Sequence, residues 1–265
     1  MASFLEGTMS EPTMPTGYGA FCWNQLNTPD LAASGAFYEG LFGWRLVEES
    51  MGGVPMQLIS NGATMVGDVM VMPPEVQAPS HWLSYVWVKD IHEVVAKATA
   101  RGATILVPVT EIPEVGRIAV FADPRGAILG VYATHKEPES PQPIGPGTFC
   151  WYECMNRDVE SEKAFYADLF GWTSTAETME GGFIYHLQHR GADQVAGMMA
   201  MDGDCWEGIP DHWMAYVAVV DIEATVAKVG PLGGTVCVPV TDIHIGRFAV
   251  LRDPVGATLS VFQVA

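Results

Sequence analysis

Four polar side chains in this sequence could perform acid–base or metal chemistry: Gln25, His81, Glu153 and His212. Side chains two residues apart on a β-strand face the same side, so a His and a Glu from neighbouring strands can share one cavity. There they could hold a metal ion or act as an acid and base pair. Alternatively, each His opens its strand as a rim residue hydrogen-bonded to a loop carbonyl, because a lone His is compatible with either role.

A second set of side chains is suited to holding a small molecule. Indole and phenol rings combine a large apolar area with a polar handle, and a guanidinium can bind a carboxylate. The two Arg of the set could equally pair with acidic residues of the chain. An amide and an imidazole, one in each half, are placed on a cavity strand by their spacing. The candidate ligand-binding residues are Trp23, Gln57, Tyr85, Arg117, Trp151, His186, Tyr216 and Arg247.

The candidates recur in pairs because the chain is a duplication. Residues 36–44 (AFYEGLFGW) and 164–172 (AFYADLFGW) are nearly identical and lie 128 residues apart. Their apolar residues fall on one stripe of a helix, and Gly43 stands where a helix ends in a left-handed residue. Further matches, with a slip of up to three residues, extend the repeat over the whole chain. The repeat therefore governs the interpretation of every local pattern.

Each half has the pattern of two strand–helix–three-strand modules. In the first half we expect helices from 28 or 29 to 42 and at 90–101, and in the second half at 158–170 and 221–230. First-half strands are expected at 19–27, 44–49, 54–60, 63–72, 82–88, 103–109, 116–122 and 127–133. One helix covers only one face of such a sheet, so modules should pair and enclose a cleft.

The sequence thus predicts an α+β fold with four βαβββ modules, forming two homologous domains with cupped mixed sheets and outer helices. We expect a flexible N-terminal tail (1–17), a first domain (18–135), a Pro-rich linker (136–146) and a second domain (147–265). Each domain is long enough to bury a core of its own.

Charge and hydropathy restrict the classes of molecule that this protein is expected to bind. Thirteen basic against 31 acidic residues give a net charge of -18, which disfavours nucleic acid and anionic membranes. The apolar runs are strand-length, so no segment should span a bilayer, and residues 1–18 lack the basic and apolar regions of a signal peptide. We expect a cytoplasmic monomer or homodimer whose partner is a small molecule.

The repeated motifs resemble the vicinal oxygen chelate superfamily, which includes lactoylglutathione lyase, bleomycin resistance proteins and extradiol dioxygenases. The resemblance rests on residues 37–38 with 41–44, on Asp123-Pro124 with Gly126, and on their copies in the second half. It covers nearly the entire chain. It implies paired modules that form a funnel-like sheet around a small-molecule site. Catalytic members of the family bind a divalent metal there through His, Gln or Glu.

This sequence departs from the family at the expected ligand positions, which carry Trp23, Leu83, Gly130, Trp151, Met214 and Ser260. None of these six is a good metal donor. Gln57 or His186 remains on another strand of each half, and one ligand does not make a site. We therefore expect no metal cofactor. The alternative is a displaced site in which the His, Gln and Glu named above hold zinc, iron, manganese or nickel.

Three functions follow, and the sequence leaves them open. The first is a protein that binds a small aromatic molecule in an apolar cavity without the family's metal. The second is a lyase or dioxygenase of the vicinal oxygen chelate type that uses the displaced His and Glu residues. The third is a structural or interaction protein whose own side chains fill its pockets. Fold alone does not decide among them.

Overall fold

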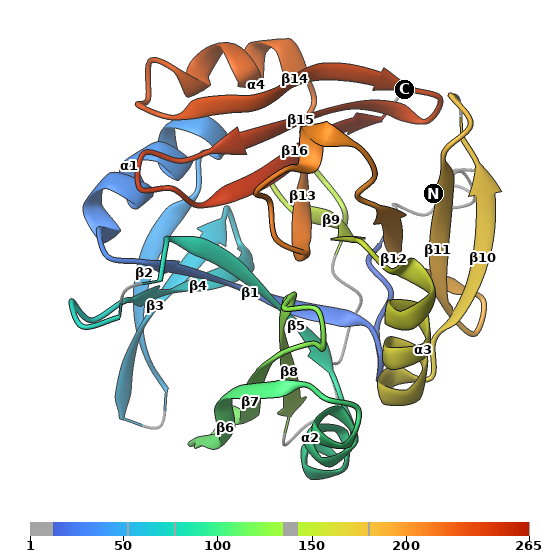
Figure 1. The fold of residues 1–265 in the computed structure, drawn as a ribbon. Helices are drawn as coiled ribbons and strands as arrows, with labels where there is room; N and C mark the ends of the chain where they lie inside the picture. Colours follow the sequence, from blue (N-terminus) through green and yellow to red (C-terminus); the bar gives the residue numbers. More distant parts are fainter. Residues whose placement is uncertain (1–12, 52, 77, 135–142, 180, 265) are drawn as a thin grey trace.

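Two eight-stranded mixed sheets, one from each half of the chain, make up the structure, a computed structural model (Figure 1). It describes residues 13–264 except 52, 77, 135–142 and 180. Within each sheet the strands of two modules meet edge to edge, so that the first strand of one module lies beside the first strand of the next. The predicted α+β architecture of four βαβββ modules is confirmed.

The first sheet has the strand order β2-β3-β4-β1-β5-β8-β7-β6. Within each module the first and last strands are parallel, β1 with β4 and β5 with β8. The elements of this half are β1 (Phe21–Thr28), α1 (Leu31–Phe42), β2 (Arg45–Met51), β3 (Val54–Asn61), β4 (Thr64–Val71), β5 (His81–Trp87), α2 (Ile91–Ala100), β6 (Thr104–Ile112), β7 (Gly116–Ala122) and β8 (Ile128–Thr134).

The second sheet repeats this order as β10-β11-β12-β9-β13-β16-β15-β14. Its elements are β9 (Phe149–Asn156), α3 (Val159–Phe170), β10 (Thr173–Thr178), β11 (Ile184–Arg190), β12 (Asp193–Ala200), a short 3-10 helix (Asp204–Trp206), β13 (His212–Ala218), α4 (Ile222–Val229), β14 (Thr235–Ile243), β15 (Gly246–Arg252) and β16 (Thr258–Val264).

Each α-helix begins at an Asp N-cap. Asp30 accepts the backbone N–H of Ala33, three residues on, and Asp90, Asp158 and Asp221 cap α2, α3 and α4 in the same manner. Such a cap satisfies a donor that the first turn leaves free. The expected start of the first helix at 28 or 29 is therefore too early, whereas Gly43 ends it with the predicted left-handed conformation (φ 76°).

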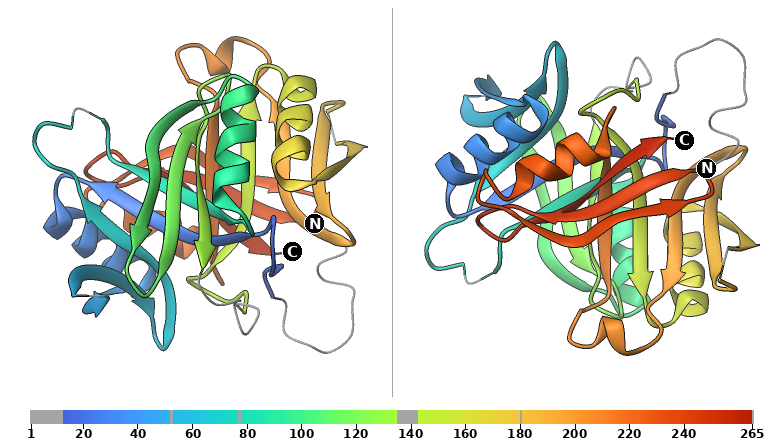
Figure 2. Two further views of the ribbon diagram at one scale, coloured as in Figure 1. Left: turned by 90° about the horizontal axis from the view of Figure 1, so that it is seen from below. Right: turned by 90° about the horizontal axis from the view of Figure 1, so that it is seen from above.

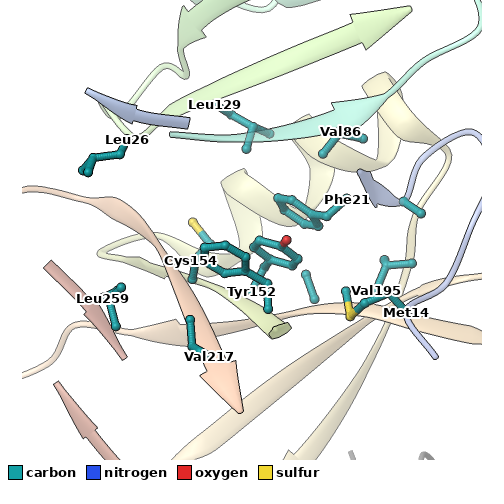
Figure 3. Packing of buried hydrophobic residues seen from close by; sticks show 14 of the residues in the cluster. Met14, Phe21, Leu26, Val86, Leu129, Tyr152, Cys154, Val195, Val217 and Leu259 are labelled. Carbon is teal, nitrogen blue, oxygen red and sulfur yellow. The ribbon is translucent and has the colours of Figure 1, made fainter. Parts of the chain in front are cut away.

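The halves pack through the sheet faces that carry the helices. Phe21, Leu26 and Val86 from the first sheet meet Tyr152 and Cys154 from the second in one shared core (Figure 3). The helices lie at the ends of this contact, α1 beside α4 and α2 beside α3 (Figures 1 and 2). They are outside the cup of each sheet, as expected, yet they also line the junction between the halves.

Reciprocal contacts relate the two halves by a pseudo-twofold. Trp44 Nε1 donates to the carbonyl oxygen of Gly147 at 2.7 Å, and Trp172 Nε1 donates to that of Gly19, also at 2.7 Å. The same exchange of equivalent residues defines an isologous interface between identical subunits. The duplication has thus retained the geometry of a symmetric dimer within one chain.

Most of the expected tail and linker falls on residues 1–12 and 135–142, outside the described residues. Within the rest of the tail, Met14 is 9% exposed and belongs to the shared core, and Thr13, although exposed, pairs with Pro143. Among the described residues, no helix is both long and apolar enough to cross a bilayer.

Candidate functional site

The candidate site lies on the face of each sheet turned away from the helices, here called the inner face. In the first half, strand register places Trp23 opposite Tyr85 and Gln25 opposite Leu83 on the same face. Tyr85 is in turn level with Gly130 on the parallel neighbour β8. Alternation then leaves the helix face to residues such as Leu26 and Val86. The structure thus brings Trp23, Gln25 and Tyr85 together, as the strand spacing indicated.

The polar centre of this inner face is Asp68 on β4, which sequence reasoning missed. Trp23 Nε1 donates to Asp68 Oδ1 at 2.6 Å, and Gln25 Nε2 donates to Asp68 Oδ2 at 2.8 Å. Tyr85 donates its hydroxyl to Gln25 Oε1 at 3.2 Å. Burial raises the pKa of Asp68, and the two side-chain hydrogen bonds offset part of that effect. The available signal was a lone acidic residue within an otherwise apolar strand.

The Tyr85 ring fills the space beside Gly130, one of the positions at which the resemblance places a metal ligand. A Cβ added at Gly130 would collide with that ring, so position 130 accepts no larger side chain while Tyr85 keeps its place. In the second half, Ser260 is level with Tyr216 in the same way and is fully buried. In both halves a tyrosine of the neighbouring strand is therefore level with this position.

The second half builds a different polar centre around Glu153. This residue is 6% exposed and accepts the Tyr216 hydroxyl at 2.6 Å on Oε2. Burial raises the pKa of Glu153, with hydrogen bonds from Tyr216 and Tyr185 opposing it. Trp151, 2% exposed, donates its indole N–H to the Tyr185 hydroxyl at 2.9 Å. Tyr185 was not among the expected site residues.

His81 and His212 are the first residues of β5 and β13. His81 Nδ1 lies 2.8 Å from the Pro79 carbonyl oxygen, and His212 Nδ1 lies 2.8 Å from that of Pro210. Register places both on the inner face, His81 beside Asn27 and His212 beside Met155. Burial lowers the pKa of His212. Both histidines thus contact a loop carbonyl at the start of a strand, which is the rim role that the sequence offered as the alternative to a catalytic role.

Gln57 and His186 lie on the helix face, not in a cavity. Gln57 pairs with Val69 and His186 with Met198, and both of these partners belong to the core between the halves. Since a shift of one residue moves a side chain to the other face of a strand, the expected cavity placement was one residue in error. The inner-face residue at that level is Tyr185 in the second half.

Arg117 and Arg247 do not point into a cavity either. Arg117 alternates with the inner-face residues Ile118 and Val120, and its Nε donates to Glu111 Oε2 at 2.7 Å. Arg247 pairs with Asp242 and, through Nη2, with Glu223 on α4 at 2.6 Å. Both guanidiniums therefore pair with acidic neighbours, the second of the two roles considered.

A cavity of about 310 Å³ opens at the end of the first inner face, where β1, β4 and β8 meet the start of β9. Six aromatic side chains surround it, and no charged side chain among the described residues does. Of the expected ligand-binding residues, only Trp23 lines it. The lining residues are Met14, Pro15, Thr16, Gly17, Ala20, Phe21, Cys22, Trp23, Asn24, Thr64, Met65, Val66, Trp87, Tyr132, Thr134, Pro143, Thr148, Phe149 and Tyr152.

The cavity walls differ from the equivalent positions of the second half. Trp87 exchanges backbone hydrogen bonds with Gly19 and Ala20, and Ala218 exchanges the same bonds with Gly147 and Thr148. A small methyl group therefore stands where the first half has an indole. The inner face of the second half is instead packed with buried rings and thioethers, including Trp151, Met155, Met214, Tyr216 and Phe262.

Comparison with known proteins settles the family. The family model of the Glyoxalase/Bleomycin resistance protein/Dioxygenase superfamily matches residues 21–131. "Putative glyoxylase CFP32" of Mycobacterium tuberculosis is 33% identical over 92% of this chain and 94% of its own length. The chain belongs to this superfamily. "Anthracycline biosynthesis protein DnrV" of Streptomyces peucetius is 29% identical over 93% of this chain and 94% of its own.

Solved structures of the superfamily share the fold. The Mn(II)-bound glyoxalase from Novosphingobium aromaticivorans aligns with a TM-score of 0.62 at 12% identity, over 94% of this chain and 83% of its own. Catechol 2,3-dioxygenase aligns with a TM-score of 0.61 at 12% identity, over 94% and 88%. At such identity the likeness concerns architecture alone.

The side chains at the positions where the resemblance places metal ligands are poor metal donors. In each half the expected ligand positions hold an indole, an apolar side chain and a Gly or Ser. The Tyr85 ring excludes a carboxylate from position 130. The nearby carboxyl groups of Asp68 and Glu153 are already engaged by N–H and O–H donors, as expected of buried carboxyls satisfied by hydrogen bonds.

Proposed function

We propose that this protein binds a small, flat, uncharged aromatic molecule in the first-half cavity, without a metal at the family's ligand positions. The observation that carries the proposal is the lining of that cavity: about 310 Å³ surrounded by Phe21, Trp23, Trp87, Tyr132, Phe149 and Tyr152. The volume lies at the small end of the range for ligand sites, roughly 300 to 1,000 Å³. A ring compound of two or three fused rings suits such a space.

The absence of charge in the described lining favours a neutral ligand. A carboxylate moved into this cavity would lose its hydration without gaining a cationic partner. The net charge of -18 adds repulsion at longer range. Arg117 and Arg247, which we considered as anchors for an anionic substrate, pair with Glu111, Asp242 and Glu223, so the ligand's polar contacts fall to hydroxyl, amide and backbone groups.

Two relatives support an aromatic ligand by their names. The "Anthracycline biosynthesis" proteins DauV and DnrV are 28% and 29% identical to this chain over nearly its whole length. The anthracycline chromophore is a flat fused-ring system, which is the ligand shape that stacked indole and phenol rings favour. The proposal extends that shape, and no specific compound, to this chain.

A lyase or dioxygenase remains the second candidate, and one observation favours it. Each half keeps one buried carboxyl near a Tyr hydroxyl, and burial raises the pKa of both Asp68 and Glu153. Carboxyls with raised pKa are the groups that enzymes use as general acids. Neither Asp68 nor Glu153 lines the cavity, so this candidate requires a movement that exposes one of them to a ligand.

The test is a calorimetric titration with three probes of similar size: 2-naphthol, 2-naphthoate and the saturated alcohol 2-decalol. We expect 2-naphthol to bind most tightly, because each ring contact adds roughly 0.5 to 1.5 kcal/mol beyond area burial. Trp23→Ala should weaken 2-naphthol binding about tenfold. Trp151→Ala, which changes the equivalent residue on the packed inner face of the second half, should not weaken it. Equal affinity for all three probes, or no binding of any, would refute the proposal.

A further inference from the structure

The polar centre of the first half is a hydrogen-bond chain with a fixed direction. Tyr85 donates to Gln25, Gln25 donates to Asp68 Oδ2, and Trp23 donates to Asp68 Oδ1. An indole N–H can only donate and a carboxylate can only accept. The orientation of the Gln25 amide is therefore set from both sides, and Asp68 is the acceptor at which both branches end.

Trp23 connects this chain to the cavity. Its indole lines the cavity, whereas Asp68, which is 3% exposed, lies behind it. The bond of 2.6 Å from Trp23 Nε1 to Asp68 Oδ1 is short for an N–H donor, as expected when the acceptor is charged. The carboxylate thus holds the N–H edge of an indole that packs against Leu83, Tyr85 and Val120 and belongs to the cavity wall.

We propose that Asp68 is a positioning residue, which fixes the Trp23 indole as a preformed wall of the aromatic cavity and so sets the affinity for flat ligands. This inference rests on the proposed function. Asp68 acts through Trp23 and does not itself touch the ligand. A wall that is already in place lowers the conformational cost of binding.

The second half shows that the fold does not require a carboxylate to accept the indole N–H. Strand register makes Glu153 equivalent to Gln25 and Gly197 equivalent to Asp68. There the acid has moved to the first strand, and Trp151 donates to the Tyr185 hydroxyl. A Cβ at Gly197 would collide with that hydroxyl. The carboxylate that holds an indole is specific to the half with the cavity.

This comparison supplies a rescue variant. In Asp68→Asn, the Gln25 amide either keeps its orientation and faces the new amide nitrogen donor to donor, or turns over and leaves the Tyr85 hydroxyl without an acceptor. One donor is unsatisfied in either case, while the amide oxygen at position 68 can still accept from Trp23 Nε1. In the double variant Gln25→Glu with Asp68→Asn, the carboxylate introduced at position 25 can accept from both Tyr85 and the amide introduced at position 68. The oxygen of that amide then remains for Trp23, and every donor has an acceptor again. The double variant places the acid on the first strand, where the second half has it.

The experiment compares wild type, Asp68→Ala, Asp68→Asn, the double variant and the matched control Tyr185→Phe, which removes the indole's acceptor in the other half. Affinity for 2-naphthol is measured by calorimetry. The position of the indole is followed by ¹⁹F NMR after 5-fluorotryptophan labelling, with the Trp23 signal assigned from Trp23→Phe. Thermal unfolding of each variant checks the fold.

We expect Asp68→Ala to weaken 2-naphthol binding about tenfold and to shift or broaden the Trp23 signal. That tenfold loss corresponds to about 1.4 kcal/mol. Asp68→Asn should have a smaller effect, and the double variant should bind 2-naphthol within about twofold of wild type. Tyr185→Phe should leave both readouts unchanged. If Asp68→Ala does not fold, Asp68→Leu, which has a similar shape to Asn and no acceptor, takes its place.

Wild-type affinity and an unmoved Trp23 signal in Asp68→Ala would overturn the inference, as would a double variant that binds 2-naphthol no better than Asp68→Ala. The two proposals fail differently. If wild type binds none of the probes while the Trp23 signal moves and is rescued as described, the positioning role stands and the aromatic ligand is wrong.

Discussion

Glu162 on α3 offers a quantitative test of the junction between the halves. Its side chain is fully buried, and no described residue donates a hydrogen bond to either carboxyl oxygen. Burial and the neighbouring Asp123 carboxylate raise the pKa of Glu162 to about 9. The equivalent residue of the first half is Ser34, which donates its hydroxyl to Asp253 Oδ2 at 3.1 Å. Glu162 therefore stands, protonated at neutral pH, where its counterpart is a small neutral donor.

The sign of the pH dependence follows from proton counting. The unfolded chain loses the Glu162 proton near pH 4.5, whereas the folded chain keeps it until about pH 9. Between these values the folded state binds more protons, so the free energy of unfolding falls as pH rises and levels off above pH 9. At about 1.36 kcal/mol per pH unit, the cost at pH 8 has an upper bound of about 5 kcal/mol. Because small movements of α3 can admit water, we expect about half of that.

The perturbation is Glu162→Gln, which keeps the shape and a donor group but cannot titrate. The control is Glu160→Gln on the same helix, where the exposed carboxylate pairs with Lys163. Urea unfolding at pH 5, 7 and 8.5 should give a stability gain for Glu162→Gln that grows with pH, while Glu160→Gln follows wild type within about 0.5 kcal/mol. A gain for Glu162→Gln that is the same at all three pH values would refute the assignment of a neutral, buried Glu162.

Two further predictions concern the metal and the core. Protein purified without chelator should contain far less than one zinc, iron, manganese or nickel ion per chain by elemental analysis. A stoichiometric ion that is lost on changing His212 or Glu153 would instead revive the displaced-site enzyme. Phe37→Ala should lower the free energy of unfolding by about 3–5 kcal/mol, because Phe37 is 2% exposed and packs against Gly234 of the other half. A loss below about 1 kcal/mol in urea unfolding would contradict that packing.

The order of the elements could be predicted because the repeat presents each pattern twice. Helix ends and strands agree with the sequence to within about three residues, and Phe37 and Phe165 are equivalent and buried, as the repeated motif implied. Periodicity and capping are local signals, and they can be recognised in the sequence without knowledge of tertiary contacts. The same signals predicted which residues of β1 and β5 share the inner face.

The faces of the outer strands could not be predicted in the same way. The sequences of β3 (VPMQLISN) and β11 (IYHLQHR) do not alternate strictly between polar and apolar residues, so Gln57 and His186 gave no indication of the side they face. The Arg residues of β7 and β15 had two acceptable roles, and only α4 and the strand-edge carboxylates decide between them. Asp68 can be placed in the site once the parallel pairing of β4 with β1 is known. Tyr185 can be placed once β11 is paired with β12, and β12 with β9.

The aromatic cavity could not be predicted from either half alone, because it exists where the halves meet. Phe149 and Tyr152 come from β9, and they close a space whose other walls belong to the first half and to residues 14–17. At the position that the pseudo-twofold relates to Trp87, the second half has Ala218, so the equivalent region lacks this indole wall. In a duplicated chain each copy can change separately, so one half can keep a tightly packed inner face while the other retains an open one. If the first half binds a ligand as proposed, stability and binding, which compete for the same apolar surface in a symmetric dimer, are assigned to different halves.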